Sequence, residues 1–366
     1  MAVKYLAGNR IQGTDAERTA SSFPSGTYAG WKELGRASGS RAVNAMLDVG
    51  SLPNKRYYMV LYDSLGGSGG YTSDIRFNTD VSSNYNYRQN ICNASSANSK
   101  PADYVPSSAE NFLNADGAGS DEYKFGVGYY SNLASNVKLG ILDNTRSGTA
   151  GAGNAPSRSH FVHKWHNSSN AIDQIRLLNR GSNTSSSANL VVLGYDPTDT
   201  NTADFWEELT PAGGIISESG ESTLDTGTIT SKKYLWLQLY SKGSTSSAMI
   251  GARFNDDGTN ENTYAWNWQE DGNNVWTAVS QDEGMITAHG ASTPAFSNQF
   301  IINESGQNKM AIGQVVEQNT AGADVAPKRM ETSWKWNNSA LVTRIRAIQM
   351  TGNFNAGSIM KVWGSN

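Results

Sequence analysis

The sequence has one cysteine, no long apolar run and little charge. With Cys92 as its single thiol, the 366-residue chain cannot form an intrachain disulfide, which is typical of a protein made in a reducing cytosol. No stretch of about 18 apolar residues occurs, so no membrane helix is expected. The segment Met1–Gly8 lacks the apolar core of a signal peptide. We therefore expect neither a membrane partner nor a cleaved leader.

Charged residues make up only 17% of the chain, against roughly 25% in ordinary globular proteins. The net charge of −4 argues against a nucleic-acid partner, because phosphate binding needs clustered Lys and Arg. Polarity comes instead from Ser, Thr, Asn and 37 glycines, a composition that favours many short strands joined by loops. Low charge also suits surfaces that contact neighbouring subunits.

Motifs that carry enzyme chemistry are missing. The sequence has no Gly-x-Ser-x-Gly elbow, no His-Glu-x-x-His and no phosphate-binding Gly-x-x-x-x-Gly-Lys-Ser/Thr loop. Acidic pairs such as Asp121-Glu122 are adjacent in sequence, whereas a glycosidase needs two carboxylates that face each other across a cleft. We therefore predict that the protein is not an enzyme and has no catalytic or cofactor-binding residues.

Three of the four histidines lie close together, at His160, His163 and His166. On a strand, His160 and His166 would share one face roughly 20 Å apart while His163 pointed to the other, so we predict surface or interface roles and no metal site. The loops at residues 196–199 and 255–261 carry oxygen ligands of the kind that calcium binds, without EF-hand spacing. Calcium in these loops stays open beside their interpretation as ordinary turns.

The chain repeats itself. The matched segments occur in one order at nearly constant offset: 55–61 with 232–238, 75–78 with 252–255, 85–87 with 264–266, 149–152 with 320–323, 155–158 with 326–329, 164–168 with 335–339, and 175–194 with 345–364. Trp31-Lys-Glu-Leu34 and Trp206-Glu-Glu-Leu209 open the two copies. A period of roughly 170 residues is far longer than a solenoid repeat and equals a whole domain. We predict two domains made by internal duplication.

The matched segments have the period of strands. Candidate strands in the first copy lie near residues 31–36, 42–48, 55–62, 73–78, 85–91, 123–130, 137–143, 159–166, 171–178 and 189–195. No window shows a sustained helical period. Eight to ten strands per copy predict an all-β protein of two tandem jelly-roll-like antiparallel β-sandwich domains.

These boundaries divide the chain into four parts. Residues 1–30 form an N-terminal arm, 31–196 the first sandwich, 197–205 a linker with little to bury, and 206–366 the second sandwich. The arm has no counterpart before the second copy. It is either a frayed terminus or an anchor that lies across a neighbouring subunit.

Aromatic residues are the best candidates for contacts. Trp165 and Trp336 match between the copies and are assigned to the cores. Four unmatched rings are candidates for a subunit contact or a sugar-stacking surface, with the core as the alternative for each: Trp268, Trp276, Trp334 and Tyr71.

Several segments resemble a known family. The opening Lys4–Gly13 with Asp15–Arg18, and the unit formed by Trp31–Arg36, Lys55–Val60, Arg76–Asn78 and Leu193–Asp196, are similar to virion-associated proteins of marine tailed phages and archaeal viruses. The resemblance covers nearly the whole chain and brings no catalytic residues. It implies a virion structural protein, made in the host cytoplasm, that serves as a capsid decoration, vertex, tail or fibre component.

The expected partners are other virion proteins and further copies of the chain, as a homo-oligomer for which a trimer is one option. A double jelly-roll major capsid protein is a subsidiary form of this hypothesis. The alternative function is a carbohydrate-binding or receptor-binding sandwich that takes a host glycan, and a third is a glycan-active enzyme on a sandwich scaffold.

Overall fold

The computed structural model describes residues 30–66, 72–92, 102–115, 122–149, 151–180, 185–196, 204–211, 213–218, 220–243, 249–255, 257–258, 261–271, 275–287, 293–318 and 325–366. Every regular element in these ranges is a β-strand, and paired strands run antiparallel. No helix in them is long and apolar enough to cross a membrane. The all-β prediction is confirmed.

The first half of the chain forms two sheets. Its strands are β1 (Lys32–Arg41), β2 (Met46–Val49), β3 (Tyr57–Gly66), β4 (Ser73–Phe77), β5 (Tyr85–Cys92), β6 (Ala102–Tyr104), β7 (Leu113–Asn114), β8 (Tyr123–Ser131), β9 (Lys138–Arg146), β10 (Ser157–Trp165), β11 (Ile175–Asn179) and β12 (Ser185–Tyr195). The large sheet has the order β1-β12-β3-β8-β9-β10-β5-β6 and the small sheet β2-β11-β4-β7. The chain alternates between β1-β12-β3-β8 and the small sheet as in a jelly roll, and β9-β10-β5-β6 extend the large sheet.

The second half has the same plan. Its strands are β13 (Glu207–Glu208), β14 (Ile215–Ile216), β15 (Thr223–Asp225), β16 (Tyr234–Ser241), β17 (Ile250–Phe254), β18 (Tyr264–Glu270), β19 (Val275–Gln281), β20 (Gly284–Thr287), β21 (Ala295–Ile302), β22 (Lys309–Glu317), β23 (Lys328–Trp336), β24 (Ile345–Gln349) and β25 (Ile359–Ser365). The large sheet runs β13-β25-β16-β21-β22-β23-β18-β19 and the small sheet β15-β24-β17-β20. Position by position, these orders match those of the first half.

Each half buries an aromatic core between its two sheets. In the first, Phe77 packs edge-on against Tyr130 at 5.1 Å between ring centroids and lies 5.5 Å from Trp165. In the second, Phe254 lies 5.1 Å from Trp334 and 5.5 Å from Trp336. Burial of each such ring contributes roughly 2–3 kcal/mol to folding. The assignment of Trp165 and Trp336 to the cores is therefore confirmed.

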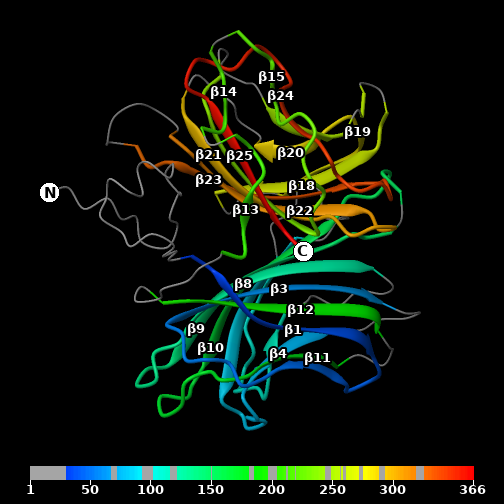
Figure 1. The fold of residues 1–366 in the computed structure, drawn as a ribbon. Coiled ribbons are helices and arrows are strands. Elements are labelled where there is room, and N and C mark those ends of the chain that lie inside the picture. Colours follow the sequence, from blue (N-terminus) through cyan, green and yellow to red (C-terminus); the bar gives the residue numbers. More distant parts are fainter. Residues whose placement is uncertain are drawn as a thin grey trace, which may run out of the picture.

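The two large sheets face each other across the middle of the molecule. A third apolar cluster joins them, with Met59, Leu61 and Phe125 from the first half and Phe300 and Ile312 from the second. The layers therefore follow the order small sheet, large sheet, large sheet, small sheet, with the first half below and the second above in Figure 1. We call the contact between the large sheets the seam.

Shared local bonds support the predicted duplication. Asn132 donates from its side-chain amide to the carbonyl of Lys55, and its side-chain oxygen accepts from the amide N–H of Ile172. Asn303 makes the same pair of bonds at the corresponding place in the second half. The common origin of the halves remains a prediction, now supported by strand order and by these bonds.

Two expectations need correction. The strand predicted at 42–48 occupies Met46–Val49, because Ala42–Ala45 form a turn with Asn44 at a positive φ of 60°. The linker was expected to bury little, yet Phe205 is 8% exposed and packs in the seam. Residues 197–203 of the linker and 1–29 of the arm lie outside the described residues.

Candidate functional site

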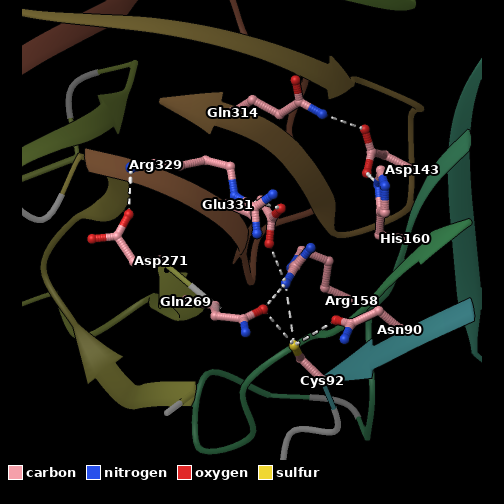
Figure 2. Close-up of polar contacts among 10 residues, drawn as sticks. All are labelled: Asn90, Cys92, Asp143, Arg158, His160, Gln269, Asp271, Gln314, Arg329 and Glu331. Carbon is pink, nitrogen blue, oxygen red and sulfur yellow. Dashed lines mark hydrogen bonds and ion pairs between the residues drawn. The ribbon is translucent and has the colours of Figure 1, made fainter. Parts of the chain in front are cut away.

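The seam contains a buried ion-pair network, drawn in Figure 2. Arg158, which is 1% exposed, donates from one terminal nitrogen to Gln269 Oε1 at 2.8 Å and lies 2.9 Å from Glu331 Oε2. The same nitrogen is 3.2 Å from the sulfur of Cys92. Arg158 and Cys92 come from the first half and the other two from the second, so the network fixes one half against the other.

A second polar chain crosses the seam beside this network. His160 Nδ1 lies 2.8 Å from Asp143 Oδ1, and Gln314 of the second half donates to the other oxygen of Asp143 at 3.0 Å. Burial alone would lower the pKa of His160, but the hydrogen bond and charge of Asp143 outweigh it and raise that pKa. The chain therefore favours the protonated form of this histidine and contributes to the contact between the halves.

The chemistry of this cluster suits a contact that holds the two halves together. Burial raises the pKa of the Cys92 thiol, which keeps it protonated and unreactive. The side chains within bonding distance of the sulfur are Asn90, Arg158 and Gln269, and none of them is a base. Among the described residues, this cluster offers no nucleophile activated by a neighbouring base.

A groove opens where the seam ends. On β9 the outward-facing residues Asp143 and Thr145 each hydrogen-bond the second half, whereas Leu139 and Ile141 on the same face are 57% and 48% exposed. The second half thus covers part of the outer face of the first large sheet and leaves the rest open. The open part lines a cavity of about 1140 Å³.

Aromatic rings line one end of the groove. The ring centroid of Trp31 lies 6.1 Å from that of Tyr129 and 5.8 Å from that of Tyr195. Tyr57 stacks on Tyr195 with 6.3 Å between ring centroids. Tyr57 and Tyr129 are 42% and 38% exposed, so their faces are available to a ligand. The floor beyond them is aliphatic, with Leu139, Ile141 and Val162 from β9 and β10.

Two cations lie at the other end of the groove. Arg88 on β5 and Lys164 on β10 are both exposed. Arg88 pairs with Val162 and Lys164 pairs with Asn86, so the two cations lie on the same face of adjacent strands. Among the described residues neither has an ion-pair partner, and the described lining of the groove includes no Asp or Glu. The groove is therefore apolar in its floor and positive at one end.

The structure separates the aromatic residues that the sequence singled out. Trp334 is fully buried in the second core, which excludes it as a surface contact. Trp268 is 9% exposed and belongs to the same core, where it stacks on Trp276 at 5.7 Å with ring planes 14° apart. Trp276 is 48% exposed on the edge strand β19. Tyr71 lies outside the described residues.

The prediction of a surface or interface role is wrong for His163. It is 3% exposed, and its Nε2 donates to the carbonyl of Asn114 while Nδ1 accepts from the Tyr130 hydroxyl. Burial lowers the pKa of His163 to about 3. His163 and Trp334 are each the seventh residue of their strands, β10 and β23, so both point into the core of their half.

The candidate calcium loops are only partly described. In the loop at 255–261, the Asp257 carboxylate accepts hydrogen bonds from the Trp336 indole and the Thr263 hydroxyl, which ties it to the core. In the loop at 196–199 only residue 196 is described. The described residues contain no group of three or more His, Cys, Asp or Glu side chains placed to hold a metal ion.

Sequence reasoning missed the groove residues Leu139, Ile141 and Val162. A detectable sign was present, since β3 carries large apolar residues on both of its alternating sets. Its Met59, Val60 and Leu61 are at most 1% exposed, so this strand is covered on both faces. Leu139, Ile141 and Val162 also lie on the outer face of this sheet, but at positions that are 42% or more exposed.

Comparison with known proteins does not assign the chain to a family. No family model matches the chain, and no curated protein is similar to it. Among solved structures, the binding domain of botulinum neurotoxin serotype D/C matches at 8% identity and a TM-score of 0.11, over 87% of this chain and 94% of that one. The C2A and C2B domains of extended-synaptotagmin 2 match at 7% identity and a TM-score of 0.09, over 78% and 93%. Likenesses this weak carry no argument about fold or function.

Proposed function

We propose that the chain is a non-enzymatic structural protein of a virus particle that acts by self-assembly and subunit contacts. The observation that supports this best is the uncovered apolar row on the outer face of the first large sheet, formed by Tyr129, Ile141 and Val162. These residues pair directly across β8, β9 and β10, so they form one continuous strip. Exposed apolar strips of this kind are typical of protein–protein contacts.

The corresponding position in the second half indicates how such a strip can be covered. Ile141 and Ile312 are each the fourth residue of their strands, β9 and β22. Ile312 is 2% exposed because it packs in the seam, whereas Ile141 is 48% exposed. The same surface is thus covered by protein in one half and open in the other. We infer that another protein surface covers it in the assembled state.

The viral setting rests on the resemblance of the sequence, and the expected places are the capsid surface, a vertex, the tail or a fibre. The partners are further copies of this chain, with a trimer as one option, together with other virion proteins. Mass spectrometry of purified particles tests this setting. A particle that lacks the chain at structural copy number would contradict it.

Substitution of the strip tests the assembly itself. Ile141→Glu places a charge in the contact and is expected to weaken self-association at least ten-fold, which corresponds to about 1.4 kcal/mol or more. Ile216→Glu is the matched control, because Ile216 is 54% exposed on β14 in the second half. Light scattering coupled to gel filtration measures the mass of each variant over a range of concentrations. A wild-type chain that stays monomeric throughout would refute the assembly proposal.

A second candidate function is glycan binding, favoured by the half-exposed ring of Trp276. Trp276 stacks on Trp268 at a sheet edge, so one of its faces can receive a sugar ring. Titration of the chain with polysaccharides, followed by tryptophan fluorescence, tests this idea, with Trp276→Ala as the variant expected to lose the response. An unchanged response in Trp276→Ala would exclude this ring as the binding surface.

A further inference from the structure

The seam between the large sheets is closed on one side and open on the other. Thr145 bonds Ser333, and one step along β9, Asp143 bonds Gln314. The next residues on the same faces are Ile141 on β9 and Val316 on β22, which are 48% and 44% exposed. Apolar side chains therefore remain uncovered on the outer faces of both large sheets.

The open side is the groove of about 1140 Å³ described above. Its floor is the strip on β8, β9 and β10, and Asn298 of the second half contributes to its wall. The positive end of the groove, at Arg88 and Lys164, lies on β5 and β10. An occupant that fits needs apolar side chains for the floor and acidic side chains for the cations.

The chain itself contains such a segment. Residues 1–29 lead through Gly30 into Trp31, which lines the groove. They carry the apolar residues Val3, Leu6 and Ile11, followed by their two acids, Asp15 and Glu17. The cations of this segment, Lys4, Arg10 and Arg18, lie outside the stretch from Ile11 to Glu17. From Ile11 to Glu17 an extended chain spans up to about 20 Å. The strands β9, β10 and β5 lie about 5 Å apart, so one segment can reach both the floor and the cations.

We propose that residues 1–29 of a neighbouring copy fill this groove, with Ile11 on the aliphatic floor and Asp15 and Glu17 beside Lys164 and Arg88. This inference rests on the function proposed above, which is why the segment is assigned to a neighbour. Each copy then gives one arm and receives one, a head-to-tail contact that generates a closed ring when the rotation closes. The arm is the partner that covers the strip.

Cross-linking between mixed chains tests the assignment in the full-length protein. One variant carries Ile11→Cys and a second carries Ile141→Cys, while the native Cys92 is buried in both. Mild oxidation of an equal mixture is expected to give a disulfide-linked dimer on a non-reducing gel. A mixture of Ile11→Cys with Ile216→Cys is the control and is expected to give at most one tenth of that dimer.

The outcomes separate the inference from the proposed function. If the mixture gives no dimer while the wild-type chain is an oligomer by light scattering, the arm inference is wrong and assembly stands. If only the double variant Ile11→Cys/Ile141→Cys cross-links, and does so as a monomer, each arm lies in the groove of its own chain and the neighbour assignment is wrong. If the wild-type chain is a monomer and no pair cross-links, both proposals fail.

Reversal of charge provides an independent readout. Lys164→Glu is expected to weaken self-association about five-fold, as for an exposed ion pair. Asp15→Lys in the same chain is expected to restore the wild-type value, because the pair is then reformed with opposite signs. Equal weakening by Lys164→Glu alone and with Asp15→Lys would contradict the placement of the acids at this end of the groove.

Discussion

Acid is expected to destabilise the first sandwich through His163. This histidine is 3% exposed, and burial lowers its pKa to about 3 from a usual 6.5. Because the unfolded chain binds the proton at pH values where the folded chain does not, stability is lost as pH falls from 6.5 toward 3. Between pH 7 and about 4.5 the loss from this one group is about 2–3 kcal/mol.

The matched variant for this prediction is His163→Gln. Its amide N–H can donate to the Asn114 carbonyl and its oxygen can accept from Tyr130, as the neutral histidine does. Urea unfolding at a series of pH values gives the stability of both proteins. The wild type is expected to lose about 2–3 kcal/mol more than the variant on acidification.

The comparison isolates this one group. Carboxylates titrate in both proteins and cancel in the comparison. The pKa of His160 is raised, because Asp143 outweighs the effect of burial, so protonation of His160 on acidification stabilises both proteins alike. His166→Gln, at an exposed position, serves as the control. Parallel pH profiles for the wild type and His163→Gln would show that His163 does not carry the acid sensitivity.

Three further predictions concern the seam and the loops. Arg158→Met removes the closer cation from Glu331, which keeps only the exposed Arg329 at 3.6 Å. This change is expected to cost about 3–5 kcal/mol in urea unfolding, most of which returns when Glu331→Leu is added. Burial lowers the pKa of Lys335 to about 8. Because the unfolded chain binds more protons between pH 8 and 10.5, the stability of the wild type is expected to rise over this range relative to Lys335→Met. Equal slopes of unfolding free energy against pH in the two proteins would contradict this. Asn132→Ala and Asn303→Ala are each expected to cost about 2–4 kcal/mol, and very unequal losses would weaken the case for corresponding roles.

Much of the fold is predictable from the sequence because the alternation of strand residues is local. The segments at 55–62, 73–78, 85–91 and 123–130 fall on β3, β4, β5 and β8. The short strands β6 and β7 were missed, since two or three residues are too few to show a period.

The burial of His163 could also have been predicted. His163 lies two residues before Trp165, which was assigned to the core, and alternation along a strand places both side chains on one face. The interpretation of the three histidines as surface groups gave weight to their polarity and none to this alternation. For Trp334, the core alternative is the one that the structure bears out.

The groove could not be predicted because it depends on how far one half extends over the other. Leu139 and Ile312 look alike in sequence, as apolar residues on the outer face of a large sheet, and are 57% and 2% exposed. Only the packing of the two sheets decides which of them is covered. Local pattern sets the face on which a residue lies, and tertiary contact sets its exposure.

The contact between Asp143 and Gln314 has a consequence for the history of the chain. Each is the sixth residue of its strand, β9 and β22, so a position in one half touches its own counterpart in the other. A two-fold dimer would repeat every other contact in both directions, yet Ile312 is 2% exposed in the seam where its counterpart Ile141 is 48% exposed. If the halves arose by duplication, their contact is therefore not a preserved symmetric dimer, and the two copies have come to present different surfaces.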